Sequence, residues 1–545
     1  MPLEVRRVLD PALPHGNRRA AQAAVLLAVV LMLFLAFRLA VVRGFDHTIG
    51  TDAWGRMLFG IGSVITEQSL GIGGYVVSSS VEAALGDSGI TGAPARLEKL
   101  DRKFPENLRD PVLIDKAIAT AGNYQGLAGH LRGPSGDDPG FVDYVKLSFA
   151  LFGPHLLSLF LTYFVLLGIE AACFFVAFRD RPACLSLLCI ALFAQICVIG
   201  SNLFDFENSG LGSVNNPRFL SVLAIIPALH AAMLAIRPER LLLGSLLPLV
   251  IQALIAALAL WIRASAVWVV AGLVLLAAWL LLIHLRANGR REWRSGVVRL
   301  FPVALFLLVL GAHAGYCRAN LNPVYHQQND VSYHPLWHAV LFSLEYNPEL
   351  STRFGALFDG RSGDEISVGA AAAYLRKHPE AARPDDYLDG LHSPEALTKV
   401  AVERYARAVF FEILSGDPAF VLKTFLYYKP RSFLLEFVGH KGLLASALDR
   451  LSRPMIVSGL LFGLFLAVGL AHLPQTRREL LAIAAIASVG FAVSSLPVLI
   501  TVPYSLALAD QLHILLIALG AWVIWGMAAA AAFCRRALAS PVPST

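Results

Sequence analysis

Charged residues are scarce in this sequence. Of its 545 residues, only 15% are Asp, Glu, Lys or Arg, whereas 56% are hydrophobic, and the mean hydropathy is +0.62. A soluble globular domain carries about 25% charged residues, which it needs to cover its water-facing surface. The shortage of charge therefore excludes a soluble protein and indicates that much of the apolar surface faces lipid.

The sequence also lacks the motifs of several function classes. Its six cysteines follow no disulfide or zinc spacing. No Walker loop, Gly-x-Ser-x-Gly elbow or complete dinucleotide loop occurs. The net charge of +6 is a mild excess that reports on membrane orientation, and no basic arm indicates nucleic acid as a partner. Nucleotide-driven transport, serine hydrolase chemistry and nucleic-acid binding therefore have no support.

Long apolar runs are what the sequence has instead. A bilayer core about 30 Å thick requires about 20 apolar residues in a helix. The sequence predicts an all-α polytopic membrane protein with about ten transmembrane helices and two helical segments on the outer face. The predicted spans are Ala21–Val42, Leu156–Phe178, Ala183–Leu203, Phe219–Ile236, Leu241–Ile262, Ala266–Leu285, Leu300–Tyr316, Met455–Leu473, Leu481–Val502 and Leu512–Phe533. The first is too long for a signal-peptide core and is expected to be a retained anchor.

Basic residues predict the orientation, because Lys and Arg in short loops stay on the cytoplasmic side. They collect before the first span and at every second boundary after it, so both termini are expected in the cytoplasm. The resulting organisation is a cytoplasmic N-terminus (1–20), a first transmembrane helix (21–42), a first periplasmic loop with surface helices (43–148), transmembrane helices 2–7 (149–316), a periplasmic helical cap (317–453), transmembrane helices 8–10 (454–534) and a cytoplasmic tail (535–545).

The cap carries the clearest local signals outside the spans. Ser393 followed by Pro394 predicts a helix start, because a hydroxyl can cap free amides and proline suits the first turn. The helix is expected to run to about Leu414 and to break at Gly416–Pro418. The stretch Phe420–Tyr428 is too short to span and is expected to lie along the membrane surface.

Two carboxylates immediately after the first span are candidate catalytic groups. Asp46 and Asp52 stand where the chain leaves the bilayer. A carboxylate fixed there can take a proton from an acceptor hydroxyl that arrives from outside, while a lipid-borne donor lies in the membrane beside it. The alternative for each is a helix cap or a solvated turn.

The first third of the chain resembles a known family. The segment Asp137–Gly153, DDPGFVDYVKLSFALFG, is followed by a long apolar run. It resembles the GT-C membrane glycosyltransferases that use polyprenyl-phosphate sugars, in which a Pro-containing turn leads a surface helix ending in Phe-Gly before the second span. The resemblance implies that Asp52 matches the catalytic base, with Asp46 as the second candidate. The Asp-Glu pair of the protein mannosyltransferases and aminoarabinose transferases is lacking here, so the resemblance does not specify the sugar.

A lipid-phosphate donor requires cations near the outer face, because the leaving phosphate gains negative charge as the glycosidic bond breaks. Arg38 lies in the outer end of the first span, and Arg218 opens the fourth span from outside. Lys429 and Arg431 follow the aromatic stretch of the cap. These four residues are the candidates for binding the donor phosphate, and the alternative for each is an interfacial anchor.

A third constellation could hold a divalent metal ion. If a helix begins at Pro335, His334 and His338 lie four residues apart, with Glu345 further along the same face. Zincin helices place a glutamate after the first histidine, where this chain has Pro335. The metal prediction therefore stands beside a simpler one, that the histidines are surface hydrogen-bonding groups.

Two other functions are compatible with the sequence. The Trp337-His338 pair is similar to the Trp-His of membrane-bound O-acyltransferases, which implies a catalytic histidine. A lipid or solute transporter would account for polar residues within the spans, namely Glu170, Gln195, His230 and Gln252.

The sequence favours a glycosyltransferase of the bacterial inner membrane over these alternatives, because more than a third of the chain forms two outer segments. Its expected partners are a polyprenyl-phosphate sugar donor, a lipid, glycan or protein acceptor on the periplasmic face, and membrane lipids.

Overall fold

The structure is a computed structural model. It describes residues 15–46, 51–87, 111–123, 130–132, 139–200, 217–236, 243–263, 266–288, 293–323, 336–357, 365–387, 397–438, 463, 474–501 and 508–539. Some helical side chains within these ranges, mainly near helix ends, are also outside the description.

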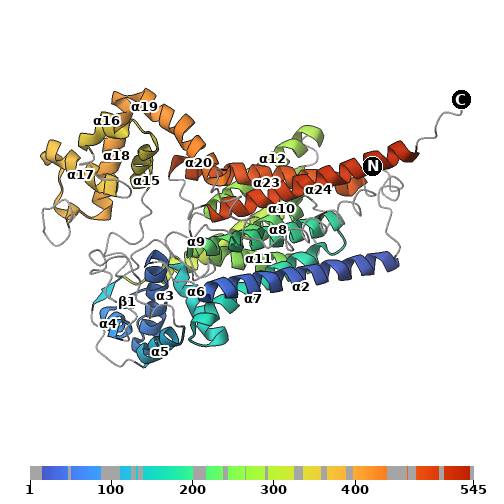
Figure 1. The fold of residues 1–545 in the computed structure, drawn as a ribbon, viewed down its shortest axis with the longest axis horizontal. Helices are drawn as coiled ribbons and strands as arrows, with labels where there is room; N and C mark the ends of the chain where they lie inside the picture. Colours follow the sequence, from blue (N-terminus) through green and yellow to red (C-terminus); the bar gives the residue numbers. More distant parts are fainter. Residues whose placement is uncertain are drawn as a thin grey trace.

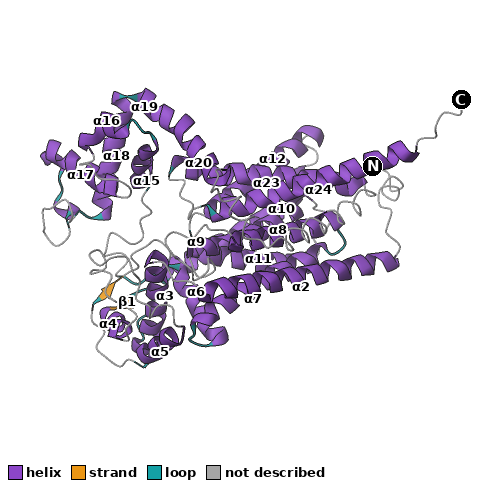
Figure 2. Cartoon of the chain, in the orientation of Figure 1, coloured by secondary structure: helices purple, strands orange, loops and turns teal. Residues whose placement is uncertain are grey.

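The fold is helical, as the composition predicts, and centres on a bundle of long apolar helices (Figure 1, Figure 2). Within the described residues the only sheet is an antiparallel ladder of two short strands, β1 (Val77–Ser78) and β2 (Leu131–Arg132). The bundle comprises α2 (His15–Asp46), α7 (Leu156–Phe178), α8 (Pro182–Gly200), α10 (Ile225–Ile236), α11 (Leu243–Ile262), α12 (Val267–Asn288), α13 (Trp293–Ala319), α23 (Pro474–Ile500) and α24 (Ala509–Ala539).

Six helices in the described part of the chain are long and apolar enough to cross a membrane. Three further predicted spans correspond to shorter apolar helical stretches, Gln22–Arg38, Ser221–Ile236 and Val270–Ile283. The predicted span Met455–Leu473 falls almost wholly outside the described residues. The chain is therefore a membrane protein with fewer clear spans than the hydropathy pattern predicts. The six are Leu156–Phe178, Pro182–Ile199, Gly244–Ile262, Val298–Ala319, Glu479–Ile500 and Ala509–Cys534.

Both long polar segments lie at one end of the bundle, opposite the end where α2 begins and α24 finishes (Figure 1). The first forms α3 (Thr51–Leu70), α4 (Ser79–Asp87), α5 (Pro111–Gly122) and α6 (Gly140–Phe152). The second forms the cap, which contains α15 (Trp337–Phe342), α16 (Leu350–Phe354), α17 (Glu365–Lys377), α18 (Lys399–Gly416) and α19 (Pro418–Lys423). After a π-helical turn, η14 (Thr424–Tyr428), helix α20 (Lys429–Val438) leads from the cap toward α23.

The main cap helix begins later than the sequence predicts. Thr398, not Ser393, is the N-cap of α18, and its hydroxyl accepts a hydrogen bond from the amide of Ala401. The preceding residue, Leu397, is held in an extended bridge with Tyr387, so the helix cannot start before that bridge ends. The predicted break is correct, because α18 ends at Gly416.

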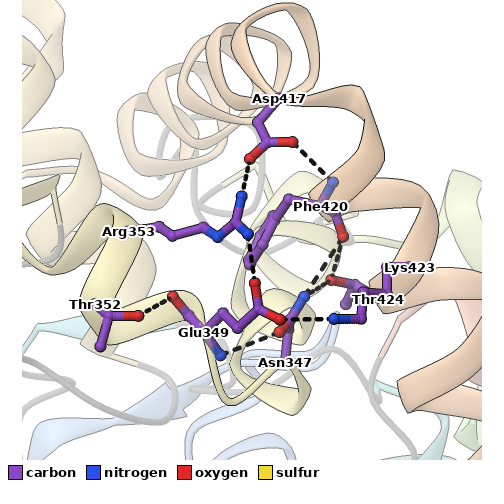
Figure 3. A network of polar contacts seen from close by, with 8 residues as sticks. All are labelled: Asn347, Glu349, Thr352, Arg353, Asp417, Phe420, Lys423 and Thr424. Carbon is purple, nitrogen blue, oxygen red and sulfur yellow. Dashed lines mark hydrogen bonds and ion pairs between the residues drawn. The ribbon is translucent and has the colours of Figure 1, made fainter.

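An ion-pair network joins the beginning of the cap to α19 (Figure 3). The guanidinium of Arg353 donates to the carboxylates of Glu349 and Asp417, and Lys423 also pairs with Glu349, at 2.6 Å. These charges are partly exposed, so each pair contributes little alone. Together they fix α16 against the start of α19.

Glycine allows the first polar segment, which contains α3 to α6, to approach the bundle closely. We call this segment the outer segment. At Gly140, the first residue of α6, a Cβ atom would lie 2.3 Å from the carbonyl carbon of Trp261 at the outer end of α11. Real Cβ atoms do not approach a backbone this closely, so only glycine fits there. This contact fixes α6 on the end of α11.

We predict that Gly140→Ala lowers the thermal unfolding midpoint of the detergent-purified protein. The added methyl group meets backbone rather than a movable side chain, and overpacking of this kind costs about 1–3 kcal/mol. Gly168→Ala is the matched control, because a Cβ there meets nothing within 4 Å. Equal midpoints for the two variants would contradict the close approach of α6 and α11.

Candidate functional site

The two predicted catalytic acids lie at adjoining helix ends. Asp46 is the last residue of α2, and Asp52 is the second residue of α3. Both therefore lie near the point where the chain passes from the bundle to the outer segment. Their side chains are outside the described part of the structure, and their catalytic role stays a prediction.

The predicted phosphate-binding arginines occupy different surroundings. Arg38 is exposed on α2, and Arg431 is exposed on α20. Arg218 lies in α9 (Pro217–Leu220), a short helix packed against both α11 and α24, although its own side chain is outside the description. Of these residues, Arg218 is the one that the fold places beside the polar cluster described below.

Lys429 is buried, unlike its neighbour Arg431. Its side chain is 0% exposed, and its Nζ atom lies 4.5 Å from the ring centroid of Phe425. The amine donates a hydrogen bond to the carbonyl of Thr501, the residue after α23. Burial lowers the pKa of Lys429 to about 6. The contact joins the cap to the bundle, and a phosphate could reach this amine only if the contact opened.

The predicted metal residues do not share one helix. Helix α15 ends at Phe342, and Ser343–Tyr346 form a 3₁₀ turn, so His338 and Glu345 are not on one continuous α-helical face. His334 is outside the described residues. Among those that are described, no group of three His, Cys, Asp or Glu side chains could hold a metal ion.

The Trp337-His338 pair belongs to the cap and not to the membrane bundle. The buried carboxylate of Glu403 accepts backbone hydrogen bonds from Leu336, Trp337 and His338 at 2.6–2.8 Å. Three amides stabilise a carboxylate strongly at a helix N-terminus. Glu403 therefore serves as the cap of α15, which gives this pair a structural explanation.

A polar cluster that the sequence analysis missed lies at the end of the bundle that carries the two polar segments, which we call the outer end. The carboxylate of Asp510, at the start of α24, is 4% exposed and accepts a 2.6 Å hydrogen bond from the hydroxyl of Ser221. Arg263, in the turn after α11, attracts it electrostatically. Ser221 follows α9 directly, in η4 (Ser221–Ala224), so Arg218 is one helical turn away in sequence. We call Asp510, Ser221 and Arg263 the outer cluster.

An apolar cavity begins one helical turn below the outer cluster. Ile225 and Ile514, four residues beyond Ser221 and Asp510, both line it. It lies between α10, α12, α23 and α24, is a small, partly open space of about 40 Å³, and is lined only by apolar side chains and glycine. The other lining residues are Ala228, Leu229, Ala232, Gly272, Leu273, Leu276, Ile486, Val489 and Gly490.

A second acid, partly buried, lies near Trp261 at the end of α11. Tyr75, which has a φ angle of +66°, donates a 2.9 Å hydrogen bond to Asp143 of α6. Burial raises the pKa of Asp143, against the opposing effects of Tyr75 and Lys146. Lys146 pairs in turn with Glu67. Positive φ is uncommon for a residue with a side chain and is often found near functional sites.

The strained Tyr75 is fixed by the turn that precedes it. At Gly74 a Cβ would lie 2.6 Å from the amide nitrogen of Asn322, whose side-chain amide donates to the carbonyl of Gly73 at 3.1 Å. The glycine-rich turn is therefore fixed against Asn322, which follows the end of α13.

The outer cluster provides an acid, a hydroxyl and a cation one helical turn from a space lined only by apolar groups. Such a site suits an amphipathic molecule that has its polar head at the outer cluster and part of its apolar chain against the cavity lining. A signal for Asp510 is present in the sequence, since it is the only acidic residue after Glu479. Its pairing with Ser221, which is 289 positions away, has no local signature.

Searches of protein-family models, of curated proteins and of solved structures find no match to this chain. The resemblance to the GT-C glycosyltransferases therefore rests on the sequence motifs alone.

Lys429 predicts a dependence of stability on pH. Its pKa is about 6 in the folded protein and 10.5 in a solvated side chain, so between these values the unfolded chain binds the additional proton. Stability should therefore rise with pH across that window, by at most about 1.4 kcal/mol per pH unit. Lys429→Met should remove this rise and be the more stable protein at neutral pH.

The measurement is the thermal unfolding midpoint of the purified protein from pH 6 to pH 10. Arg431→Met is the control, because it removes an exposed cation from the same helix and should leave the slope in place. An unchanged slope in Lys429→Met would show that the lysine is solvated.

Proposed function

We propose that this protein is a membrane glycosyltransferase of the GT-C type. It transfers a sugar from a polyprenyl-phosphate donor to a lipid, glycan or protein acceptor at the periplasmic face of a bacterial inner membrane. The observation that carries the proposal is the apolar cavity whose upper end meets the outer cluster at Ile225 and Ile514.

The cavity and the outer cluster match the two parts of such a donor. An isoprenoid chain is apolar, so one of its prenyl groups can pack against this apolar lining while the rest of the chain lies in the lipid. A phosphate is anionic and is stabilised by guanidinium groups such as those of Arg263 and Arg218. Arg38 on α2 and Arg431 on α20 are further candidates for binding the phosphate.

The transfer requires a base and a stabilised leaving group. Asp52 or Asp46 takes the proton from the acceptor hydroxyl, whose oxygen forms the new bond to the anomeric carbon of the sugar. The bond from that carbon to the phosphate oxygen breaks, and the arginines stabilise the departing polyprenyl phosphate. No metal ion is required by this scheme, although a divalent ion would also neutralise the phosphate.

The membrane topology is part of the proposal. Ten spans with both termini in the cytoplasm place the outer segment and the cap together in the periplasm. The position of both at one end of the bundle supports this arrangement (Figure 1). The cap is then the part that selects the acceptor, since it stands beside the membrane surface from which the donor head emerges.

We predict that Asp52→Asn abolishes transfer of radiolabelled sugar from a polyprenyl-phosphate donor, with the amount of folded protein unchanged. Loss of a general base typically lowers the rate about 10²–10⁴-fold. Asp46→Asn is the paired variant that identifies which carboxylate acts. Full activity in both variants would refute the assignment. If the protein instead transfers an acyl group, and His338→Ala loses that activity while the two aspartate variants keep it, the O-acyltransferase alternative is favoured.

Filling the cavity tests the donor-binding proposal separately. Ala228→Phe adds a ring to the cavity lining and should reduce activity with a long-chain donor much more than with a short-chain, water-soluble one. The matched control is Leu247→Phe, a substitution at an exposed position on α11. Equal loss with both donors would show that the variant damages the fold rather than the lipid site. Solute movement in liposomes without any covalent product would favour a transporter.

A further inference from the structure

The interior of the bundle contains an acid without a partner. Glu170 of α7 is 0% exposed, and neither of its carboxylate oxygens has a hydrogen-bond partner among the residues that the structure describes. No lysine or arginine among the described residues pairs with it. A charge buried in this way inside a membrane is costly, and acids at such positions commonly bind protons or ions.

Two further buried polar side chains lie at the same level of the bundle. The side-chain amide of Gln252 on α11 donates to the backbone carbonyl of Glu170 at 2.8 Å, while its own oxygen has no partner. His230 on α10 is 0% exposed, and neither ring nitrogen has a partner. Its ring contacts Phe174 and Phe178, one and two turns after Glu170.

The three helices α7, α10 and α11 pack against one another. From the ends of these helices that lie away from the cap, the three residues are about 9–14 Å into the bundle at 1.5 Å per residue. They therefore form one polar layer in the half of the bundle opposite the outer cluster. Five of its atoms lack a partner: two oxygens of Glu170, two nitrogens of His230 and one oxygen of Gln252.

Helix-to-helix hydrogen bonding does not account for this layer. Polar residues that only join membrane helices have their donors and acceptors paired, as Asp510 has with Ser221. Here the carboxylate of Glu170 and the amide oxygen of Gln252 are both acceptors, and no donor among the described residues forms a hydrogen bond with either. What such a set of oxygens lacks is a positive charge.

We propose that Glu170, with Gln252, forms an intramembrane binding site for a monovalent cation, either a proton or a sodium ion. The ion neutralises the carboxylate and is held by oxygen ligands. The site goes beyond glycosyl transfer and is distant from the outer cluster, so it stands or falls independently of the proposed function.

The groups that face Glu170 do not supply this charge. On its own helix, Tyr163 and Cys173 interact with it electrostatically, and both are neutral in their ordinary form. Tyr163 is in turn bonded to Gln195 of α8. His230, on α10, is the remaining titratable group of the polar layer, and neither of its ring nitrogens forms a hydrogen bond within the described part of the chain.

Dicyclohexylcarbodiimide tests the site on the full-length protein. This apolar reagent enters membranes, and a protonated carboxyl group adds across its N=C=N unit to form an N-acylurea without a leaving group. Mass spectrometry of the wild-type protein should find the adduct on Glu170. The labelling rate should fall about tenfold per pH unit above the pKa, as the protonated fraction falls. Glu170→Gln should lose this adduct, and Glu380→Gln, an exposed control in the cap, should retain it.

Sodium distinguishes the two ions. If sodium is the ligand, replacing choline chloride by sodium chloride at fixed pH slows the labelling of Glu170. The same replacement raises the thermal unfolding midpoint of the wild type but not that of Glu170→Gln. If the proton is the ligand, pH alone changes the labelling rate. Absence of the adduct on Glu170, or a rate that responds to neither pH nor sodium, would overturn the proposal. The glycosyltransferase assay is not involved in any of these outcomes.

Discussion

The absence of water in the bilayer core is the constraint on which this structure depends. Every polar group in the bundle has to find its partner within the protein. Asp510 meets this demand through Ser221 and Arg263, whereas Glu170 does not. The two ends of the bundle therefore differ. At the outer end the buried acid has partners and lies above an apolar cavity, whereas the acid in the other half lacks a partner among the described residues.

The outer parts are joined to the bundle by different kinds of contact. The first outer segment is fixed by close approach of backbones, at Gly140 against Trp261 and at Gly74 against Asn322. The cap is joined through α20, where the buried amine of Lys429 meets the carbonyl of Thr501. The glycine contacts join backbone to backbone, whereas the contact of the cap arm with α23 is made by side chains of α20, including Phe433 and Phe437 against Phe491.

The sequence predicts the helical fold and most spans because hydropathy over about 20 residues is a local property. It fails where packing decides. The start of α18 follows the bridge at Leu397 and not the proline signal, and His338 and Glu345 are separated by a change of helix type. The candidate acids Asp46 and Asp52 come from chain position, but the outer cluster requires Asp510 and Ser221 to meet across the fold.

The arm formed by α19, η14 and α20 carries large apolar side chains on its outside. Leu426 is 74% exposed and Val438 is 72% exposed, and Leu422, Tyr427, Leu434 and Leu435 are exposed with them. If these side chains insert into the headgroup region, the arm stays at the level of the lipid surface. Since α20 is anchored on α23, a thinner or thicker bilayer would tilt the arm and thereby change how far the cap stands above the lipid.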